Sequence, residues 1–313
     1  MSTITQRRNR PAPQLGGRTP VGSTRRTSLI ALAFLAPALI ILSVFVAWPM
    51  LSALRLSFTD ASGFGQEEYV GLDNYVRVFT DPSVLQALGN TAYYALLFTP
   101  TAIVAALVLA LLVNHRRLPG RGAFRTALFL PFIVSLAVAA FAWSYLLDPQ
   151  IGLLNYWLRA FGVQLGNVLQ DPSLAMPTVA LVAVWKSFGF YLVIFIAGLQ
   201  EIPSSLYEAA RVDGATAWQR FRHITLPMLS NTLAFVMIVA LIAALQAFDQ
   251  IYVMTGGGPY GTTQTVVMEI YTSGFKKLEL GFASALSYVL LLITLALSLV
   301  QFRFFSRREK DVQ

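Results

Sequence analysis

The sequence predicts an all-α membrane protein with six transmembrane helices. Of its 313 residues, 56% are hydrophobic and only 12% are charged, whereas about a quarter of the residues in an ordinary soluble domain are charged. The apolar residues form blocks that reach the roughly 20 residues needed to cross the hydrocarbon of a bilayer. Arginine and lysine cluster beside these blocks, as they do in loops that set membrane orientation. These observations argue against a soluble domain and against nucleic-acid binding.

Six apolar blocks are long enough to be spans. The first would be about 39 Å long as a helix, against a hydrocarbon core of about 30 Å, so we expect it to tilt or to emerge from the membrane. Its length and the Trp48-Pro49 pair near its end argue against a cleaved signal peptide. The expected spans are about residues 29–54, 91–114, 126–147, 177–200, 231–253 and 280–302.

The distribution of basic residues predicts the orientation of the chain. Six is an even number, so both termini must lie on the same side of the membrane. The two tails and the loops at 115–125 and 201–230 hold 17 of the 23 lysines and arginines, and the opposite loops hold five. By the positive-inside rule both termini are cytoplasmic. Because Lys186 lies within the fourth span, it belongs to neither group.

The chain therefore divides into a membrane domain and two tails. Residues 1–28 contain six arginines among Pro, Gly, Ser and Thr, so we expect a disordered basic cytoplasmic tail. Residues 29–305 form the transmembrane domain, and residues 306–313 form a second cytoplasmic tail. In one external loop, five apolar residues at helical spacing predict a helix on the membrane surface: Leu153, Leu154, Trp157, Leu158 and Phe161.

The cytoplasmic segment 201–230 predicts two short helices joined by a turn. Pro203 suits a first helical position, and Asp213-Gly214 is a strong turn signal with an expected positive φ at the glycine. A second amphipathic stretch follows, with Trp218, Phe221 and Ile224 at a spacing of three residues. The small Ala209 and Ala210 side chains would leave the first helix narrow enough to enter a groove on another protein.

This loop resembles the EAA loop of the inner-membrane permeases of binding-protein-dependent ABC importers. Glu208-Ala209-Ala210, followed after three residues by Gly214, matches the short form of that motif. The resemblance extends over residues 29–305, and the chain is similar to the maltose-type sugar permeases. The further matching residues are Asp213, Ala215, Trp218, Phe221, Leu226-Pro227 and the external turn Tyr252–Pro259.

The resemblance implies a type I ABC importer permease fold in a prokaryotic inner membrane, with the EAA loop as a coupling helix. It also implies three kinds of partner: an ATPase subunit dimer that binds ATP and Mg, a second homologous permease, and an extracytoplasmic solute-binding protein. Gly256, Gly258 and Gly261 satisfy a GxGxxG pattern, but no βαβ unit surrounds them and Thr262 stands where a P-loop needs lysine. We therefore expect no cofactor, no metal and no nucleotide site in this chain.

Candidates for the solute pathway lie in the spans that flank the EAA loop, where the resemblance places a sugar site. Lys186 and Asp249 are charged residues within spans, which are costly and often functional, although a mutual ion pair would make them structural. The alanines of the fifth span form a stripe that indicates either close helix packing or a pathway wall. The candidates are Lys186, Ser187, Phe190, Ala240, Ala243, Ala244, Ala247 and Asp249.

The function that these features favour is import of a sugar or oligosaccharide by a non-enzymatic pore subunit. A glycerophosphodiester or another sugar-like solute remains an alternative, because a cationic Lys186 would suit a phosphorylated or acidic solute. An ion-coupled secondary transporter could use Lys186 and Asp249 but has no use for an EAA loop. A membrane enzyme is disfavoured, since His115 and His223 are the only histidines and no nucleophile–base constellation appears.

Overall fold

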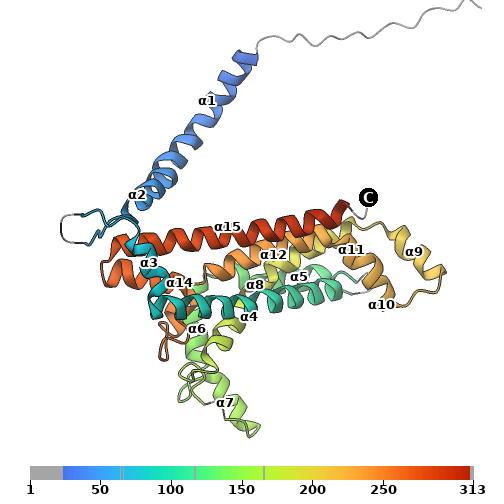
Figure 1. Ribbon diagram of the computed structural model, residues 1–313. Coiled ribbons are helices and arrows are strands. Elements are labelled where there is room, and N and C mark those ends of the chain that lie inside the picture. The colour runs from blue at the N-terminus through green and yellow to red at the C-terminus, as the bar shows by residue number, and fades with distance from the viewer. Residues whose placement is uncertain (1–23, 64, 66, 116–117, 165, 311–313) are drawn as a thin grey trace, which may run out of the picture. The chain divides into compact units, whose positions relative to one another are not determined.

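The computed structural model describes residues 24–310 except 64, 66, 116–117 and 165 (Figure 1). The chain forms two compact units, Met1–Ser52 and Ala53–Gln313. The described part of the first unit is helical: α1 (Thr24–Leu42) passes through a π-turn, η1 (Ser43–Ala47), into α2 (Trp48–Leu56), which continues into the second unit. The expected disordered tail lies outside the described residues except for 24–28, which are helical.

The second unit is a bundle of helices with short elements at its two ends. In chain order these are α3 (Asp73–Thr80), α4 (Pro82–Val113), α5 (Arg121–Ile133), α6 (Leu136–Leu146), α7 (Leu153–Ala160), α8 (Ala175–Glu201), α9 (Ser204–Val212), α10 (Ala217–Arg220), η2 (Phe221–Thr225), α11 (Leu226–Met228), α12 (Ser230–Leu245), α13 (Asp249–Met254), α14 (Val266–Tyr271), η3 (Thr272–Lys276) and α15 (Leu280–Lys310). Within the described ranges, extended pairing is limited to two isolated bridges, Thr59–Tyr69 and Ser62–Glu279.

Among the described residues, four helices are long and apolar enough to cross a membrane: Leu32–Leu56, Pro82–Val113, Ala175–Glu201 and Leu280–Phe305. Two bent pairs, Arg121–Ile133 with Leu136–Leu146 and Ala217–Met228 with Ser230–Leu245, bring the number to six if each pair is one span. Six spans were expected, and the second begins earlier than expected. Pro82 is the first residue of α4, and the Asp81 carboxylate accepts a hydrogen bond from the Ser83 N–H at 2.9 Å, so a proline and a cap start this helix.

The third expected span, 126–147, is not a continuous helix. It bends by 94° between α5 and α6, where Val134 and Ser135 have extended backbone. Pro131 already removes one helical donor in the last turn of α5. The bend lets α6 pack against α13.

The fifth expected span, 231–253, is also interrupted. Helix α12 ends at Leu245, and Phe248 has a non-helical backbone (φ −140°, ψ −61°) before α13 begins. The carbonyl of Ala247, which lies in this break, accepts a hydrogen bond from the Thr265 hydroxyl at 3.0 Å. Asp249 is therefore the first residue of a short helix rather than a residue within a continuous span.

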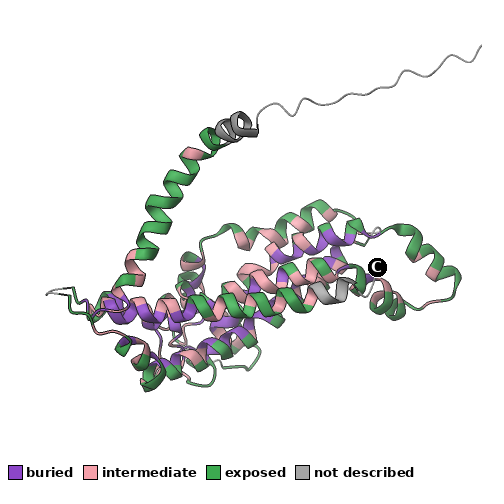
Figure 2. Cartoon of the chain, turned by 45° about the horizontal axis from the view of Figure 1, so that its top comes forward, coloured by how far each residue is buried: buried purple, intermediate pink, exposed green. Residues whose placement is uncertain are grey.

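The core of the bundle lies between α4 and α8, with α12 packed on α4 (Figure 2). Its large side chains include Tyr94, Leu192 and Phe195, which are buried. Close approach of the helices depends on small residues, as is usual in membrane bundles. Gly189 of α8 is an example, because a Cβ there would collide with the Leu128 carbonyl of α5.

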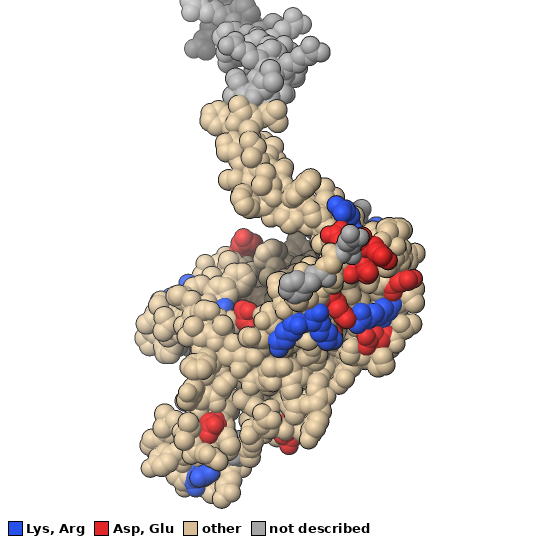
Figure 3. All heavy atoms as spheres, turned by 90° about the vertical axis from the view of Figure 1, so that its left-hand side faces the viewer, with Lys and Arg blue, Asp and Glu red and all other residues tan. Residues whose placement is uncertain are grey.

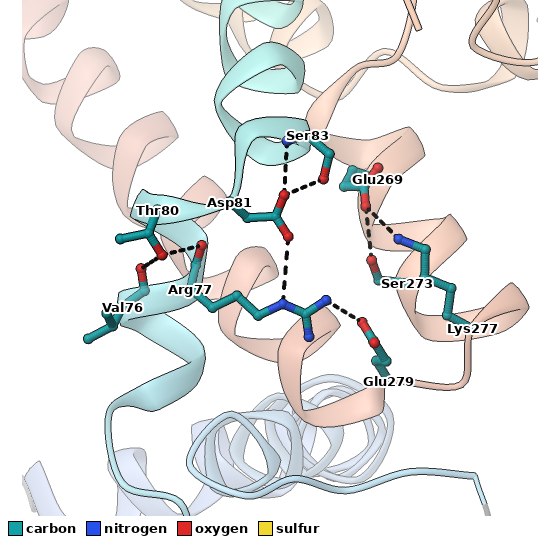
Figure 4. A network of polar contacts seen from close by, with 9 residues as sticks. All are labelled: Val76, Arg77, Thr80, Asp81, Ser83, Glu269, Ser273, Lys277 and Glu279. Carbon is teal, nitrogen blue, oxygen red and sulfur yellow. Dashed lines mark hydrogen bonds and ion pairs between the residues drawn. The ribbon is translucent and has the colours of Figure 1, made fainter.

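Charged side chains gather in one mixed cluster at the end of the bundle away from α9 and α10 (Figure 3). Arg77 is its centre: the guanidinium binds Glu279 at 2.9 Å and Asp81 at 3.6 Å (Figure 4). The guanidinium also lies 3.9 Å from the ring centroid of Phe282. Lys277 contacts Glu269 at 3.4 Å. The Arg77 contacts join α3 to α15 and to the segment that precedes it, and the Lys277 contact joins that segment to α14, so these elements are fixed at that end of the bundle.

Candidate functional site

The EAA segment forms an exposed elbow, residues 204–228, at one end of the bundle. Helices α9 and α10 project there, at the same end as the C-terminal end of α15 (Figure 1). Glu208, Ala209, Asp213 and Gly214 are exposed and Ala210 is half-buried. The structure thus brings all five predicted loop residues onto one solvent-accessible element.

The turn of the elbow has the local geometry that its sequence predicts. Gly214 has φ +75°, in the left-handed region that favours glycine. The Ala215 N–H donates to the Ala210 carbonyl at 2.8 Å, which closes α9. A capping box then starts α10, because the Thr216 hydroxyl accepts from the Gln219 N–H and the Gln219 side chain accepts from the Thr216 N–H.

A hydrogen bond joins the two arms of the elbow, α9 and η2. The hydroxyls of Tyr207 on α9 and Thr225 on η2 lie 2.9 Å apart, and Thr225 is buried. Beyond this contact the elbow exposes large apolar side chains, with Val212 88% and Trp218 66% exposed.

The basic residues of the elbow are not neutralised within the described part of the chain. The described ion pairs all lie at the opposite end of the bundle, and none involves Arg211, Arg220 or Arg222. The guanidinium of Arg211 donates to the Tyr207 carbonyl, and that of Arg220 donates to the Ala215 carbonyl. The elbow therefore carries net positive charge on a surface that also exposes apolar groups.

A second site is a small pocket of about 140 Å³ enclosed by α4, α6, α8 and the break between α12 and α13. Its lining includes four of the predicted pathway residues: Ser187, Ala243, Ala247 and Asp249. It also includes Tyr94, Phe98, Leu136, Ala183, Gln246, Phe248 and Gln250, which sequence reasoning did not single out. We call this cavity the polar pocket.

Gln250 gives the polar pocket its chemistry. The residue is only 3% exposed, and its Nε2 donates a 2.7 Å hydrogen bond to the hydroxyl of Tyr94. Its Oε1 atom is buried and has no hydrogen-bond partner among the described residues. A buried amide oxygen without a donor is costly, so Gln250 is a lining residue whose acceptor is unused.

Lys186 does not form the ion pair with Asp249 that was one interpretation of the two charges. Both residues are described, and no contact of 4.0 Å or less joins their charged atoms. The ammonium instead lies 4.5 Å from the ring centroid of Phe132, which stacks on Phe190 at 4.8 Å. Lys186 and Phe190 thus belong to a cation–aromatic cluster at the α5–α8 interface, beside Ser187 of the polar pocket.

The four alanines of the stripe occupy two kinds of position, two in the packed core and two in the lining of the polar pocket. Ala240 and Ala244 are fully buried in the core and allow α12 to approach its neighbours. Ala243 is exposed and lines the polar pocket together with the buried Ala247. The packing interpretation therefore holds for two of the four alanines.

Comparison with known proteins identifies the family. Residues 79–310 match the family described as "Binding-protein-dependent transport system inner membrane component". The chain belongs to this family. This ABC transporter permease is thus a multi-pass protein of the inner membrane, and among its described residues no group of His, Asp and Glu is arranged to hold a metal.

Curated relatives resemble this permease over most of its length. The probable ABC transporter permease protein YurN of Bacillus subtilis (strain 168) is 38% identical over 290 residues, 91% of this chain and 99% of the relative. The sn-glycerol-3-phosphate transport system permease protein UgpA of Agrobacterium fabrum is 38% identical over 275 residues, 87% of this chain and 93% of the relative. The sequence resemblance to importer permeases is confirmed.

Solved structures share the fold of the permease. A bacterial ABC transporter involved in the import of the acidic polysaccharide alginate has a chain with a TM-score of 0.79 and 27% identity, covering 90% of this chain and 96% of that one. The same kind of transporter in complex with an alginate pentasaccharide-bound periplasmic protein gives a TM-score of 0.77 and 26% identity, with coverage of 88% and 93%. The all-α, type I ABC importer permease fold is confirmed.

Proposed function

We propose that this permease subunit forms half of a translocation pathway for a sugar or oligosaccharide and that the elbow couples the pathway to a separate ATPase. The exposed EAA elbow is the observation that carries the proposal. It combines a glycine-closed turn, an exposed Glu208 and exposed apolar side chains on one projecting element. Such a surface suits a groove on another protein better than it suits water.

The proposal places the elbow end of the bundle and both termini in the cytoplasm. The unpaired basic residues of the elbow support this orientation, because loops rich in Arg and Lys stay on the cytoplasmic side. The C-terminal end of α15 lies at the same end (Figure 1). The opposite end, where carboxylates pair with the basic residues, then faces outward.

In this proposal three kinds of partner complete the transporter. An ATPase dimer binds ATP and Mg and receives the elbow, and a second homologous permease supplies the other half of the pathway. An extracytoplasmic binding protein delivers the solute, as the structure of the alginate transporter with its periplasmic protein illustrates for that system. Closure of the ATPase dimer would move the elbow and rock the attached helices.

The polar pocket is the proposed point of contact with the solute. Ser187, Asp249 and the free Oε1 of Gln250 are groups that hydrogen-bond hydroxyls. A hydroxyl-rich solute matches this set, and the alginate transporter of similar fold is involved in the import of a polysaccharide. Ala240 and Ala244 serve packing, whereas Ala243 and Ala247 form the apolar wall.

A second candidate solute is a phosphorylated polyol such as a glycerophosphodiester. It is favoured by Lys186, whose ammonium is held by an aromatic ring rather than by a carboxylate, and by the similarity to the sn-glycerol-3-phosphate permease UgpA. Comparing uptake of neutral sugars with uptake of sn-glycerol 3-phosphate separates the two.

The test of the coupling role is the charge reversal Glu208→Lys in the assembled transporter. A carboxylate that binds a donor on the ATPase contributes about 1.5–3 kcal/mol, so we expect loss of ATPase association or of solute-stimulated hydrolysis while the spans remain inserted. Glu68→Lys is the matched control, because Glu68 is exposed at the opposite end of the bundle. Near-normal uptake and hydrolysis with Glu208→Lys would refute the coupling role.

A further inference from the structure

Four aromatic side chains at the end of the bundle away from the elbow form a continuous surface, which we call the aromatic platform: Phe248, Tyr252, Tyr271 and Phe275. The ring centroids of Phe248 lie 5.3 Å from Tyr252 and 5.2 Å from Tyr271. Tyr271 lies 5.3 Å from Tyr252 and stacks on Phe275 at 5.5 Å. The rings come from two segments, the start of α13 and the α14–η3 element.

The platform is held rigidly. The Val266 N–H at the start of α14 donates to the Thr91 hydroxyl of α4 at 2.9 Å. Asn90 of α4 donates to the carbonyls of Gly261 and Gln264 at 2.8 and 2.9 Å. These contacts, with the Thr265–Ala247 bond, fix both segments against the bundle, so the rings keep their relative positions.

The platform is accessible and leads to the polar pocket. Phe275 is 73% exposed and Tyr252 is 42% exposed, whereas Phe248 at the other end lines the polar pocket. The next residues after Phe248 are Asp249 and Gln250, which also line that pocket. Ring faces outside the pocket are therefore continuous with a buried acceptor inside it.

The platform carries one positive charge. The Lys276 ammonium lies 5.9 Å from the ring centroid of Tyr252 and 5.7 Å from that of Tyr271, within the range of a cation–π contact. The ion pairs of the described chain do not include Lys276, whereas the neighbouring Lys277 contacts Glu269. The ammonium is thus free to bind an anionic group that rests on the rings.

We propose that the aromatic platform binds a pyranose ring that carries a carboxylate or a phosphate, before the solute enters the polar pocket. The proposal rests on the proposed function and names a solute class for it. The apolar C–H face of a pyranose can lie on the tyrosine and phenylalanine rings, since aromatic faces are electron-rich and their edges are not. Lys276 binds the anionic substituent, and the buried Gln250 Oε1 accepts a hydroxyl hydrogen bond from a ring that has moved inward.

The chemistry separates this ligand from others. A neutral sugar satisfies the rings but not Lys276, and sn-glycerol 3-phosphate satisfies Lys276 but has no ring. Of these three ligands, the anionic pyranose alone satisfies both. A docking helix of another protein would bury the ammonium without satisfying it unless it supplied a carboxylate.

The test is saturation-transfer difference NMR on the full chain in lipid nanodiscs with four probes: a uronic acid trisaccharide, the neutral trisaccharide of the same linkage, glucose 6-phosphate and sn-glycerol 3-phosphate. We expect transfer to the ring C–H protons of the uronate or of the sugar phosphate, and which of the two is stronger identifies the anionic group. Phe275→Ala and Lys276→Gln should each weaken binding about two- to tenfold. Phe275→Trp and Lys276→Arg should retain it.

Tyr156→Ala is the matched control, because Tyr156 is an exposed aromatic residue on α7 outside the platform. Equal transfer from wild type and from both loss-of-binding variants would overturn the proposal. So would loss of a co-purifying permease partner in Phe275→Ala with unchanged transfer, since the platform would then be a subunit interface. The proposed coupling function is tested separately: Glu208→Lys should abolish uptake without changing the saturation transfer to the solute.

Discussion

Lys186 illustrates how a single charged side chain is accommodated inside a helical bundle. Its ammonium lies over the Phe132 ring, and Phe132 stacks on Phe190, one turn away from Lys186 on α8. An aromatic face compensates a cation only in part, worth about 0.5–2 kcal/mol, whereas a carboxylate would neutralise it. Because no carboxylate of the described residues lies within 4.0 Å of this ammonium, we propose that it acts on an anionic solute.

We expect substitution of Lys186 to change transport rather than assembly. Lys186→Gln removes the charge and keeps most of the volume, so uptake of an anionic solute should fall about two- to tenfold while uptake of a neutral sugar changes less. Lys186→Arg, which keeps the charge, is the control. The measurement is uptake of both solutes by proteoliposomes with equal amounts of assembled transporter. A variant that fails to assemble, with no selective transport defect, would indicate a structural role.

Gln250 and Tyr94 show what residue-level sequence reasoning could not find. They are 156 positions apart and their contact depends on how α13 meets α4. Nothing in either local sequence signals it, since Gln250 is one of three polar residues, with Gln246 and Asp249, in an otherwise apolar run. By contrast, Ser187 and Asp249 stood out as polar or charged residues near the expected site, and both line the polar pocket.

At the scale of elements, the sequence predicts features that depend on local residues, such as turns and helix caps. It does not predict helix breaks that depend on packing between distant segments. Helix α9 begins at Ser204, so Pro203 is its N-cap and not the expected first helical residue, whereas its turn at Asp213-Gly214 was expected and the capping box at Thr216 is readable in the sequence. The breaks at 134–135 and 246–248 have no glycine or proline at the break itself. They exist because α6 packs on α13 and because Thr265 binds the Ala247 carbonyl.

The turn of the elbow allows a test of element orientation. Gly214→Val should impair coupling while leaving the spans inserted, because a β-branched residue at φ +75° is strained. The space around the glycine is open, so the effect should come from the backbone and not from a collision. Stimulated ATPase activity of the purified complex is the measurement.

The matched control for this prediction is Gly162→Val. Gly162 has φ +78° and equally open surroundings, but it lies beyond the C-terminal end of α7. A similar loss of coupling in both variants would mean that the defect reflects general strain instead of re-aiming of α9.

The start of α4 permits a stability test. The Asp81 carboxylate caps this helix and binds the Ser83 hydroxyl at 2.7 Å, and that hydroxyl is the main cause that lowers the pKa of Asp81. Asp81→Ala should therefore destabilise the protein by about 0.5–1 kcal/mol at neutral pH. Asp81→Asn, which keeps the cap but loses the contact with Arg77, should cost less.

The pH dependence of this effect has a definite sign. A lowered pKa in the folded state means that the stabilisation is present above the unfolded pKa, about 4, and is lost as the pH falls through the folded value. The difference between wild type and Asp81→Ala should shrink in acid. Thermal unfolding in detergent at several pH values measures it, and a difference that grows in acid would contradict the assignment.

At the scale of the whole molecule, the bundle has two chemically different ends. One end holds the described ion pairs and also carries the aromatic platform with its unpaired Lys276, and the other exposes an elbow whose basic residues have no ion pair among the described residues (Figures 1 and 3). A solute that binds at the first end can affect a partner at the second only by moving rigid helices. Helix α12 leads from the polar pocket to the end of the elbow, and α8 leads from Ser187 of the pocket to the start of the elbow, so these two helices connect the two sites.

This division of roles predicts that the purified chain alone neither binds nor hydrolyses ATP. The glycines at 256, 258 and 261 lie in a turn between α13 and α14, and within residues 249–271, all of which are described, neither a parallel strand nor a P-loop lysine accompanies them. Equilibrium dialysis with labelled ATP on the isolated subunit should give no stoichiometric binding, and the assembled transporter should bind ATP at its ATPase subunits. Stoichiometric binding by the isolated chain would place a nucleotide site in the bundle itself, and the elbow would then have no power stroke from a separate ATPase to transmit.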